Sequence, residues 1–174
     1  MAADDNERAE RKADDTTEKA AASVRLVEDL VAQVSGFEEA HECHAFNENG
    51  VLPHVFFWDV VQDTVHSYLA EGDPDGPDWR RVLAFLEEET RRRVPGAIEV
   101  IVTSFLYSLP HQGKPGYGIE EHLGPAMKES YLQLRPWYTH NHGRWQQPRI
   151  NETAQCSTSL GSHPPDQDIS QSAW

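Results

Sequence analysis

The sequence brings together four residues of types that can bind metal ions or act in catalysis: Glu39, His41, Cys43 and His44. His41 and His44 are three residues apart, so on a helix their imidazoles would share one face. A metal site needs further ligands, and His54 or His66 is the candidate for a third, although the spacing matches no zinc motif. A metal-binding enzyme or regulator that uses His41, His44 and His54 is therefore one interpretation, and histidines exposed on a connecting segment are the other.

The pair Cys43 and His44 has the residue types of a nucleophile and its base. Neighbours in sequence rarely point at one another, however, and catalytic partners usually meet through the fold. Neither the phosphate-binding loop of nucleotide hydrolases nor the glycine fingerprint of dinucleotide-binding proteins occurs. We therefore predict no catalytic residue and no cofactor.

The charge of the chain is strongly negative, with 29 acidic against 15 basic residues and a net charge of −14. Such a surface repels the phosphates of nucleic acids and anionic lipids, so neither a nucleic acid nor a membrane is an expected partner. The same charge favours a basic protein, because complementary fields speed the encounter of two proteins. The sequence carries no indication of an oligomeric state.

Two features bear on where the protein resides. No apolar run follows the first charged residues, so a secretory signal is not predicted. The most apolar stretch, Ala97 to Leu109, includes Glu99 and is shorter than the roughly 20 residues that a membrane helix needs. We therefore expect a soluble, cytoplasmic protein.

Apolar residues recur at helical spacing of three and four in several segments. This pattern predicts an all-α fold, a small bundle of about five helices over residues 23–137. Residues 1–22 are charged and lack large apolar side chains, and residues 138–174 are polar, so both are predicted to be flexible tails. The expected helices cover residues 23–36, 53–71, 77–93, 97–109 and 125–136, with 37–50 as a connecting segment that has room for a short helical turn.

Particular residues support these boundaries. Pro53 and Pro125 suit the first position of a helix, and Pro136 is expected to end the last one. A buried strand is the competing interpretation of residues 97–109, but the length of the run favours a helix. Trp58 and Trp79 lie on apolar faces and are predicted to be core residues.

The stretch from Leu52 to Trp137 resembles an uncharacterised bacterial family of small helical proteins, some of which are associated with immunity to polymorphic toxins. Members of that family often have Phe-Leu-Glu where this chain has Phe105, Leu106 and Tyr107. Because Tyr107 stands where those members have a glutamate, the resemblance assigns no function to this position. The residues that carry the resemblance are Leu52, Pro53, Phe56 and Phe57, then Phe105, Leu106 and Leu109, and finally Leu123, Gly124 and Pro125.

The resemblance implies a non-enzymatic immunity or antitoxin-like protein that neutralises a basic toxin by presenting an acidic face to it. The carboxylates expected on this face are Glu87, Glu88, Glu89, Glu120 and Glu121. The first three also lie four residues before Arg91, Arg92 and Arg93, a spacing that stabilises a helix. A further alternative is an adaptor protein whose ends recruit partners.

Overall fold

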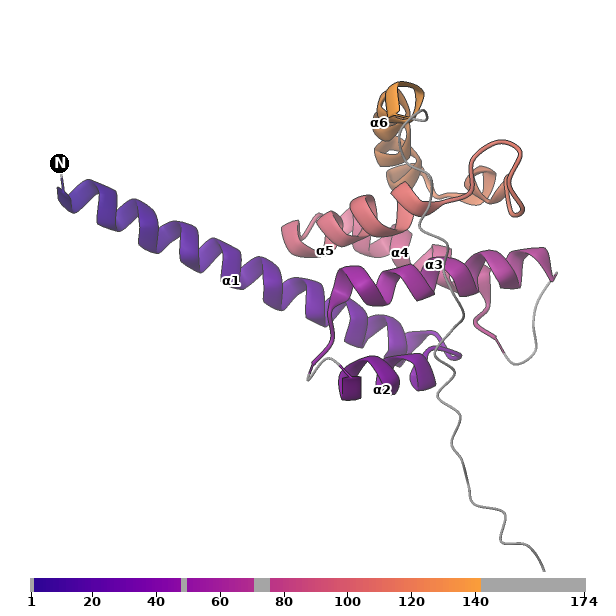
Figure 1. Cartoon of the computed structure of the whole chain (residues 1–174), viewed down its shortest axis with the longest axis horizontal. Helices are drawn as coiled ribbons and strands as arrows, with labels where there is room; N and C mark the ends of the chain where they lie inside the picture. The colour runs from indigo at the N-terminus through magenta and orange to yellow at the C-terminus, as the bar shows by residue number, and fades with distance from the viewer. Residues whose placement is uncertain (1, 48–49, 71–75, 142–174) are drawn as a thin grey trace, which may run out of the picture.

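The computed structural model describes residues 2–47, 50–70 and 76–141, without the side chains of residues 2–7, 9, 47 and 135–141. All regular elements in these ranges are helical, which confirms the predicted all-α fold (Figure 1). In chain order they are α1 (Ala2–Gln33), α2 (Glu38–Asn47), α3 (Pro53–Leu69), α4 (Trp79–Arg92), α5 (Pro95–Val100), the π-helix η1 (Ile101–Leu106), the 3₁₀ helix η2 (Ile119–His122) and α6 (Pro125–Asn141).

The helices pack around α3, which runs across the middle of Figure 1 with α2 below it and α6 above. The C-terminal half of α1 packs on α5, α3 and α4, whereas its N-terminal half stands clear of the other helices. The π-helix η1 continues directly from α5 and packs along α3, while α6 packs on α4. The molecule is thus a compact bundle with one projecting helical arm.

Local signals explain where several helices begin. Pro53, Pro95 and Pro125 are the first residues of α3, α5 and α6, where a missing N–H is no loss. The helix α4 begins after Asp78, whose carboxylate accepts a hydrogen bond from the Arg80 amide at 2.9 Å. The predicted starts at Pro53 and Pro125 are therefore confirmed.

Aromatic residues dominate the hydrophobic core. Trp79 is buried, as predicted, but Trp58 is 40% exposed, so its predicted place in the core is wrong. The reason is that Phe56 and Phe57 occupy the inner face of α3, and the next residue turns away by about 100°. The largest fully buried side chains are Phe37, Phe56, Phe57 and Phe105.

The N-terminal boundary at residue 23 is corrected by the structure, because α1 begins at Ala2 rather than near Ser23. The added segment is rich in Ala, Glu, Lys and Arg, which favour helix. Asp15 and Lys19 also form an ion pair at 2.8 Å, one turn apart. Once the packed half of α1 has nucleated, extending it towards the N-terminus costs little.

The connecting segment expected over 37–50, with at most a short helical turn, contains the ten-residue helix α2, so the prediction underestimated its helical content. Glu38 accepts a hydrogen bond from the Gly36 amide at 2.7 Å, while the fully buried Phe37 ties the start of α2 to the core. Hydrogen bonds from the backbone amides of Glu38 itself and of Gly36 lower the pKa of the Glu38 carboxyl. Tertiary anchoring thus supports a helix that has little amphipathic pattern of its own.

The last helix extends further than predicted. A stop at Pro136 and a domain end at residue 137 were expected, but α6 continues to Asn141. A proline inside a helix removes one hydrogen bond without always ending the helix. The remainder of the predicted C-terminal tail, residues 142–174, lies outside the described residues.

The apolar run from Ala97 to Leu109 is helical, as predicted, and the strand alternative is excluded. Its middle part is a π-helix, which the apolar pattern did not reveal. The buried side chains Ile101, Phe105 and Leu106 belong to this wider turn. A π-helix often marks a position where packing, rather than local preference, determines the backbone.

A close backbone crossing holds α1 against α5. A Cβ atom at Gly96 would lie 2.7 Å from the Lys19 carbonyl carbon and nearer still to its oxygen. Because the obstacle is backbone rather than a movable side chain, only glycine fits here. Lys19 belongs to the segment predicted to stay unpacked, so the crossing also shows that this segment contributes to the domain.

We predict that Gly96→Ala lowers the free energy of unfolding by about 1–3 kcal/mol, because the added methyl overlaps the backbone of α1. The direction of this change shows whether the crossing is close, because replacing Gly by Ala inside an uncrowded helix raises the free energy of unfolding by about 0.5–1 kcal/mol. Urea denaturation followed by circular dichroism measures the difference. Lys19→Ala is the control and should have a small effect; a Gly96→Ala variant more stable than wild type would contradict the crossing.

Candidate partner-binding surface

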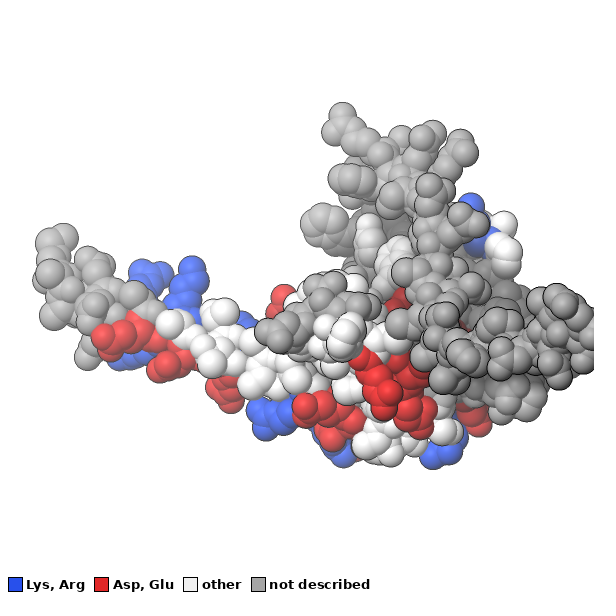
Figure 2. Space-filling view, turned by 60° about the horizontal axis from the view of Figure 1, so that its bottom comes forward, with Lys and Arg blue, Asp and Glu red and all other residues white. Residues whose placement is uncertain are grey.

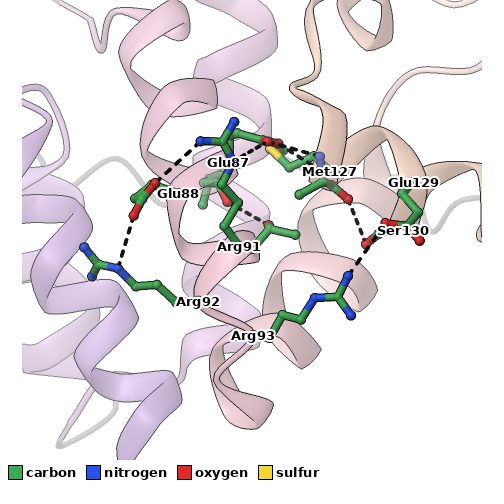
Figure 3. A network of polar contacts seen from close by, with 11 residues as sticks. Glu87, Glu88, Arg91, Arg92, Arg93, Met127, Glu129 and Ser130 are labelled. Carbon is green, nitrogen blue, oxygen red and sulfur yellow. Dashed lines mark hydrogen bonds and ion pairs between the residues drawn. The ribbon is translucent and has the colours of Figure 1, made fainter.

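Glu87, the first carboxylate of the predicted acidic face, is buried where α4 meets the start of α6 (Figure 3). Its two oxygens accept hydrogen bonds from the amides of Ala126 at 3.1 Å and Met127 at 3.0 Å. Arg91 also donates to it at 3.1 Å. Amides at a helix N-terminus lack partners within the helix and carry partial positive charge, so Glu87 caps α6.

The contact between Glu87 and α6 requires a glycine two residues before Ala126. A Cβ atom at Gly124 would lie 2.5 Å from Glu87 Cγ and closer to the carboxylate itself. Gly124 therefore lets the carboxylate reach the helix start. The predicted role of Glu87 in contacting a partner is contradicted by this burial.

The next two carboxylates are matched by arginines on the same helix. Glu89 is buried and accepts a hydrogen bond from Arg92 at 2.8 Å; burial raises the pKa of its carboxyl, and the Arg92 charge opposes that rise. Glu88 is exposed and lies 3.9 Å from Arg91 and 3.6 Å from Arg92. This end of α4 is thus a balanced set of charges, and Glu89, like Glu87, is not free to contact a partner.

Glu120 and Glu121 belong to η2. Glu120 is half-buried and accepts a hydrogen bond from the Gly118 amide at 2.7 Å, which holds the turn before η2. Glu121 is exposed. Of the five predicted carboxylates, Glu88 and Glu121 remain available at the surface.

The histidines proposed as metal ligands pack in different ways. His44 lies 2.7 Å from Asp59 on α3, and its ring contacts the edge of Phe56. His41 also packs against Phe56, and its Nε2 is buried without a hydrogen-bond partner among the described residues. Both imidazole rings therefore help to pack α2 against α3.

His54 does not join them, because its Nδ1 lies 2.8 Å from the Ser104 hydroxyl on η1. In the part of the chain that the structure describes, no three His, Cys, Asp or Glu side chains are grouped so that they could hold a metal. The predicted grouping of His41, His44 and His54 is therefore wrong. Packing on Phe56 draws the first two towards α3, while η1 holds the third.

A pocket of about 280 Å³ opens beside Glu87. Arg80 stacks 4.2 Å from the centre of the Trp79 ring in its wall. The Glu87 carboxylate already bonds to α6, so the pocket has no free carboxylate to hold a cation. Its lining residues are Trp79, Arg80, Leu83, Ala84, Glu87, His122 and Gly124.

The unbalanced negative charge lies elsewhere, on α2 and the adjoining edge of α3. Glu39 and Glu42 are exposed on α2, and neither forms an ion pair with another described residue. Asp59 and Asp63 follow on α3, one helical turn apart, and the contact of Asp59 with His44 places Asp59 beside α2. Figure 2 brings the lower side of Figure 1 forward and shows Asp and Glu side chains near the middle of the view, with Lys and Arg side chains beside them along the lower rim.

We call Glu39, Glu42, Asp59 and Asp63 the α2–α3 acidic surface. The sequence contains a signal for it that motif searching missed: no Lys or Arg occurs between Arg25 and Arg80. A run of adjacent acidic residues such as Glu87 to Glu89 is easier to recognise in a sequence than a long stretch without Lys or Arg. The absence of nearby bases, however, is what leaves a surface charged.

Asp63 has the most unfavourable environment of these four carboxylates. Partial burial raises the pKa of its carboxyl, and the neighbouring Asp59 charge raises it further, while His66 partly offsets both. A carboxylate whose pKa rises on folding destabilises the folded state when it is charged.

We found no match between this chain and any protein-family model, curated protein or solved structure. The resemblance over Leu52 to Trp137 therefore stays a prediction. None of the helices within the described ranges has both the length and the apolar character needed to cross a membrane.

We predict that Glu87→Ala costs about 1–3 kcal/mol of stability, because it leaves the buried amides at the start of α6 without an acceptor. Gly124→Ala should also destabilise the protein, but much less in the Glu87→Ala background, where the added methyl has room. A double-mutant cycle by urea denaturation should give a coupling of at least about 0.5 kcal/mol. Glu88→Ala is the control, expected within about 0.5 kcal/mol of wild type; additive effects of the first two substitutions would contradict the cap.

A second prediction concerns pH. The folded-state pKa of Asp63 lies above the unfolded value, so the charged carboxylate lowers stability at neutral pH, and this penalty disappears as the pH falls through the folded pKa towards the unfolded one. Asp63→Asn should therefore be more stable than wild type at pH about 7, with the difference vanishing near pH about 4. The urea denaturation midpoints of both proteins, measured across this pH range, test the prediction. A variant that is less stable than wild type at neutral pH would contradict it.

Proposed function

We propose that this protein is a non-enzymatic binding protein, an immunity or antitoxin-like inhibitor that neutralises a basic partner protein through the α2–α3 acidic surface. The observation that carries the proposal is that Glu39 and Glu42 are exposed on α2 without an ion pair to another described residue, in a stretch with no Lys or Arg between Arg25 and Arg80. The resemblance over Leu52 to Trp137 points to the same class of protein. The proposed place of action is the cytoplasm.

The mechanism in this proposal is electrostatic and steric. An acidic surface attracts a basic cleft, speeds association and disfavours acidic competitors. The carboxylates of α2 stand on a helix that is fixed to the core by Phe37 and by the packing of His41 and His44 on Phe56. A rigid acidic surface loses little conformational entropy on binding, which favours a tight complex.

The adaptor alternative is supported by one feature of the fold. The N-terminal half of α1 projects from the bundle and exposes charged side chains of both signs, including Glu10, Arg11 and Lys12. A partner of an adaptor would bind this arm and not α2. The metal-binding alternative is not proposed again, because His54 bonds to Ser104 instead and no three potential ligands are grouped among the described residues.

The test is an affinity pull-down of the tagged chain from its native host in moderate salt, with identification of bound proteins by mass spectrometry. We expect one basic protein to be retained. The double charge reversal Glu39→Lys with Glu42→Lys should weaken its binding by at least about tenfold and reduce the dependence of affinity on salt, because the surface loses its attraction.

The matched control carries the same change in charge at Glu88→Lys with Glu121→Lys, two exposed carboxylates away from α2. Its affinity should fall by less than about threefold, through net charge alone. Failure to retain a basic partner would remove the proposal. A partner lost on deletion of residues 2–18, but unaffected by the reversal at α2, would establish the adaptor instead.

A further inference from the structure

The outward face of α3 carries large apolar side chains that no other described element covers completely. Leu52, just before the helix, is 46% exposed, Val55 is 49% exposed and Trp58 is 40% exposed. Spaced three residues apart, these side chains adjoin one another on one side of the helix. We call these three residues the anchor patch.

The anchor patch continues as a stripe along α3. Positions 55, 58, 62, 65 and 69 alternate steps of three and four, which is the spacing of a helix-binding seam, and four of the five are apolar, with the polar Gln62 in the middle. Val65 in this series is partly covered by the loop at Gly116, and Leu69 at the far end is 52% exposed. From Leu52 to Leu69 the stripe extends about 25 Å, the length of a helix of about 17 residues.

The surroundings of the stripe are acidic. The helices α2 and α3 and the continuous α5–η1 helix contain no Lys or Arg. Asp59 follows Val55 by one helical turn and is half exposed, so it borders the anchor patch directly. On the outer face of α2, Glu42 is followed one turn later by Phe46, which is 88% exposed.

We propose that the anchor patch binds a basic amphipathic helix of the partner protein, with the partner's apolar side on Val55 and Trp58 and its Lys or Arg side chains towards Asp59. Charge complementarity selects this occupant, because an acidic amphipathic helix would meet the Asp59 carboxylate beside the patch and the exposed Glu42 on α2. Amphipathic helices bind such surfaces through apolar residues at positions i, i+3, i+4 and i+7. This inference rests on the proposed function, for which it supplies the contact residues and the chemistry of the partner.

Hot spots of protein interfaces are enriched in tryptophan and are bordered by polar residues that exclude water. Trp58 matches this description, because it is partly packed and partly exposed and the polar Asp59 follows it directly in the sequence. A second copy of this chain is a poorer occupant. Pairing α3 with itself would bring Asp59 and Asp63 of both copies together without a neutralising base.

The experiment uses the full chain and a fluorescent peptide of about 14 residues with Leu on one face and Lys on the other. The comparison peptides are oligolysine of equal charge and the same Leu pattern with Glu in place of Lys. We expect the Leu/Lys peptide to bind at least about tenfold more tightly than either, as measured by fluorescence anisotropy.

Leu52→Ser with Val55→Ser should weaken binding of the Leu/Lys peptide at least about tenfold. Both side chains are half exposed, so the variant should fold, and circular dichroism checks this. Leu132→Ser is the matched control, since Leu132 is 52% exposed on α6, and it should bind as wild type does. Asp59→Asn should weaken binding at low salt and leave it nearly unchanged at high salt.

Equal affinity for oligolysine and the Leu/Lys peptide would overturn this inference, because it would show that the surface binds peptides through charge alone. So would a natural partner that binds the Leu52→Ser, Val55→Ser variant as tightly as wild type, although the proposed function would stand. Sedimentation that shows a dimer dissociated by the same variant would identify a second copy as the occupant instead. If no partner is recovered from the host, the proposed function fails, and the peptide titration still decides whether the patch binds basic helices.

Discussion

The buried carboxylate of Glu87 is the interaction on which the upper half of the bundle depends. A charge taken out of water must find partners, and Glu87 finds them in two amides of α6 and in Arg91. Through this contact α6 is held on α4, and the fully buried Met127 closes the core between them. The requirement extends to Gly124, where any side chain would occupy the space of the carboxylate.

The same type of residue serves a different purpose on the other side of the molecule. Along α4 each glutamate is buried, bonded to backbone amides or paired with an arginine, so its charge is used within the fold. Along α2 and α3 the carboxylates Glu39, Glu42 and Asp59 face solvent with no Lys or Arg on their own helices. Burial and the presence of neighbouring bases therefore determine whether an acidic residue stabilises the fold or remains available to a partner.

Helical periodicity and proline positions were enough to predict the all-α fold and the starts of α3 and α6, because both signals are local. Two elements that depend on packing were missed, α2 and the π-helix η1. The N-terminal half of α1 was missed for a different reason: it has no apolar periodicity and extends a helix that is packed only further along. Trp58 and Trp79 lie on similar apolar patterns, yet only Trp79 is buried, with Tyr68 and His122 in edge contact with its ring. For the site, sequence neighbours suggested Glu87 to Glu89 as one surface, but a helix turns by about 100° per residue, which carries Glu87 and Glu89 inward and leaves Glu88 outside.

Stability and recognition place opposite demands on α3. Its inner face, with Phe56, Phe57 and Val60, has no exposed surface and contributes to the core. Its outer side keeps Val55 and Trp58 partly in water and holds Asp63 in surroundings that raise the pKa of its carboxyl, and both features cost free energy in the isolated protein. A basic amphipathic partner would recover both costs at once, since it would cover the apolar side chains and supply the positive charge that α2, α3 and η1 lack.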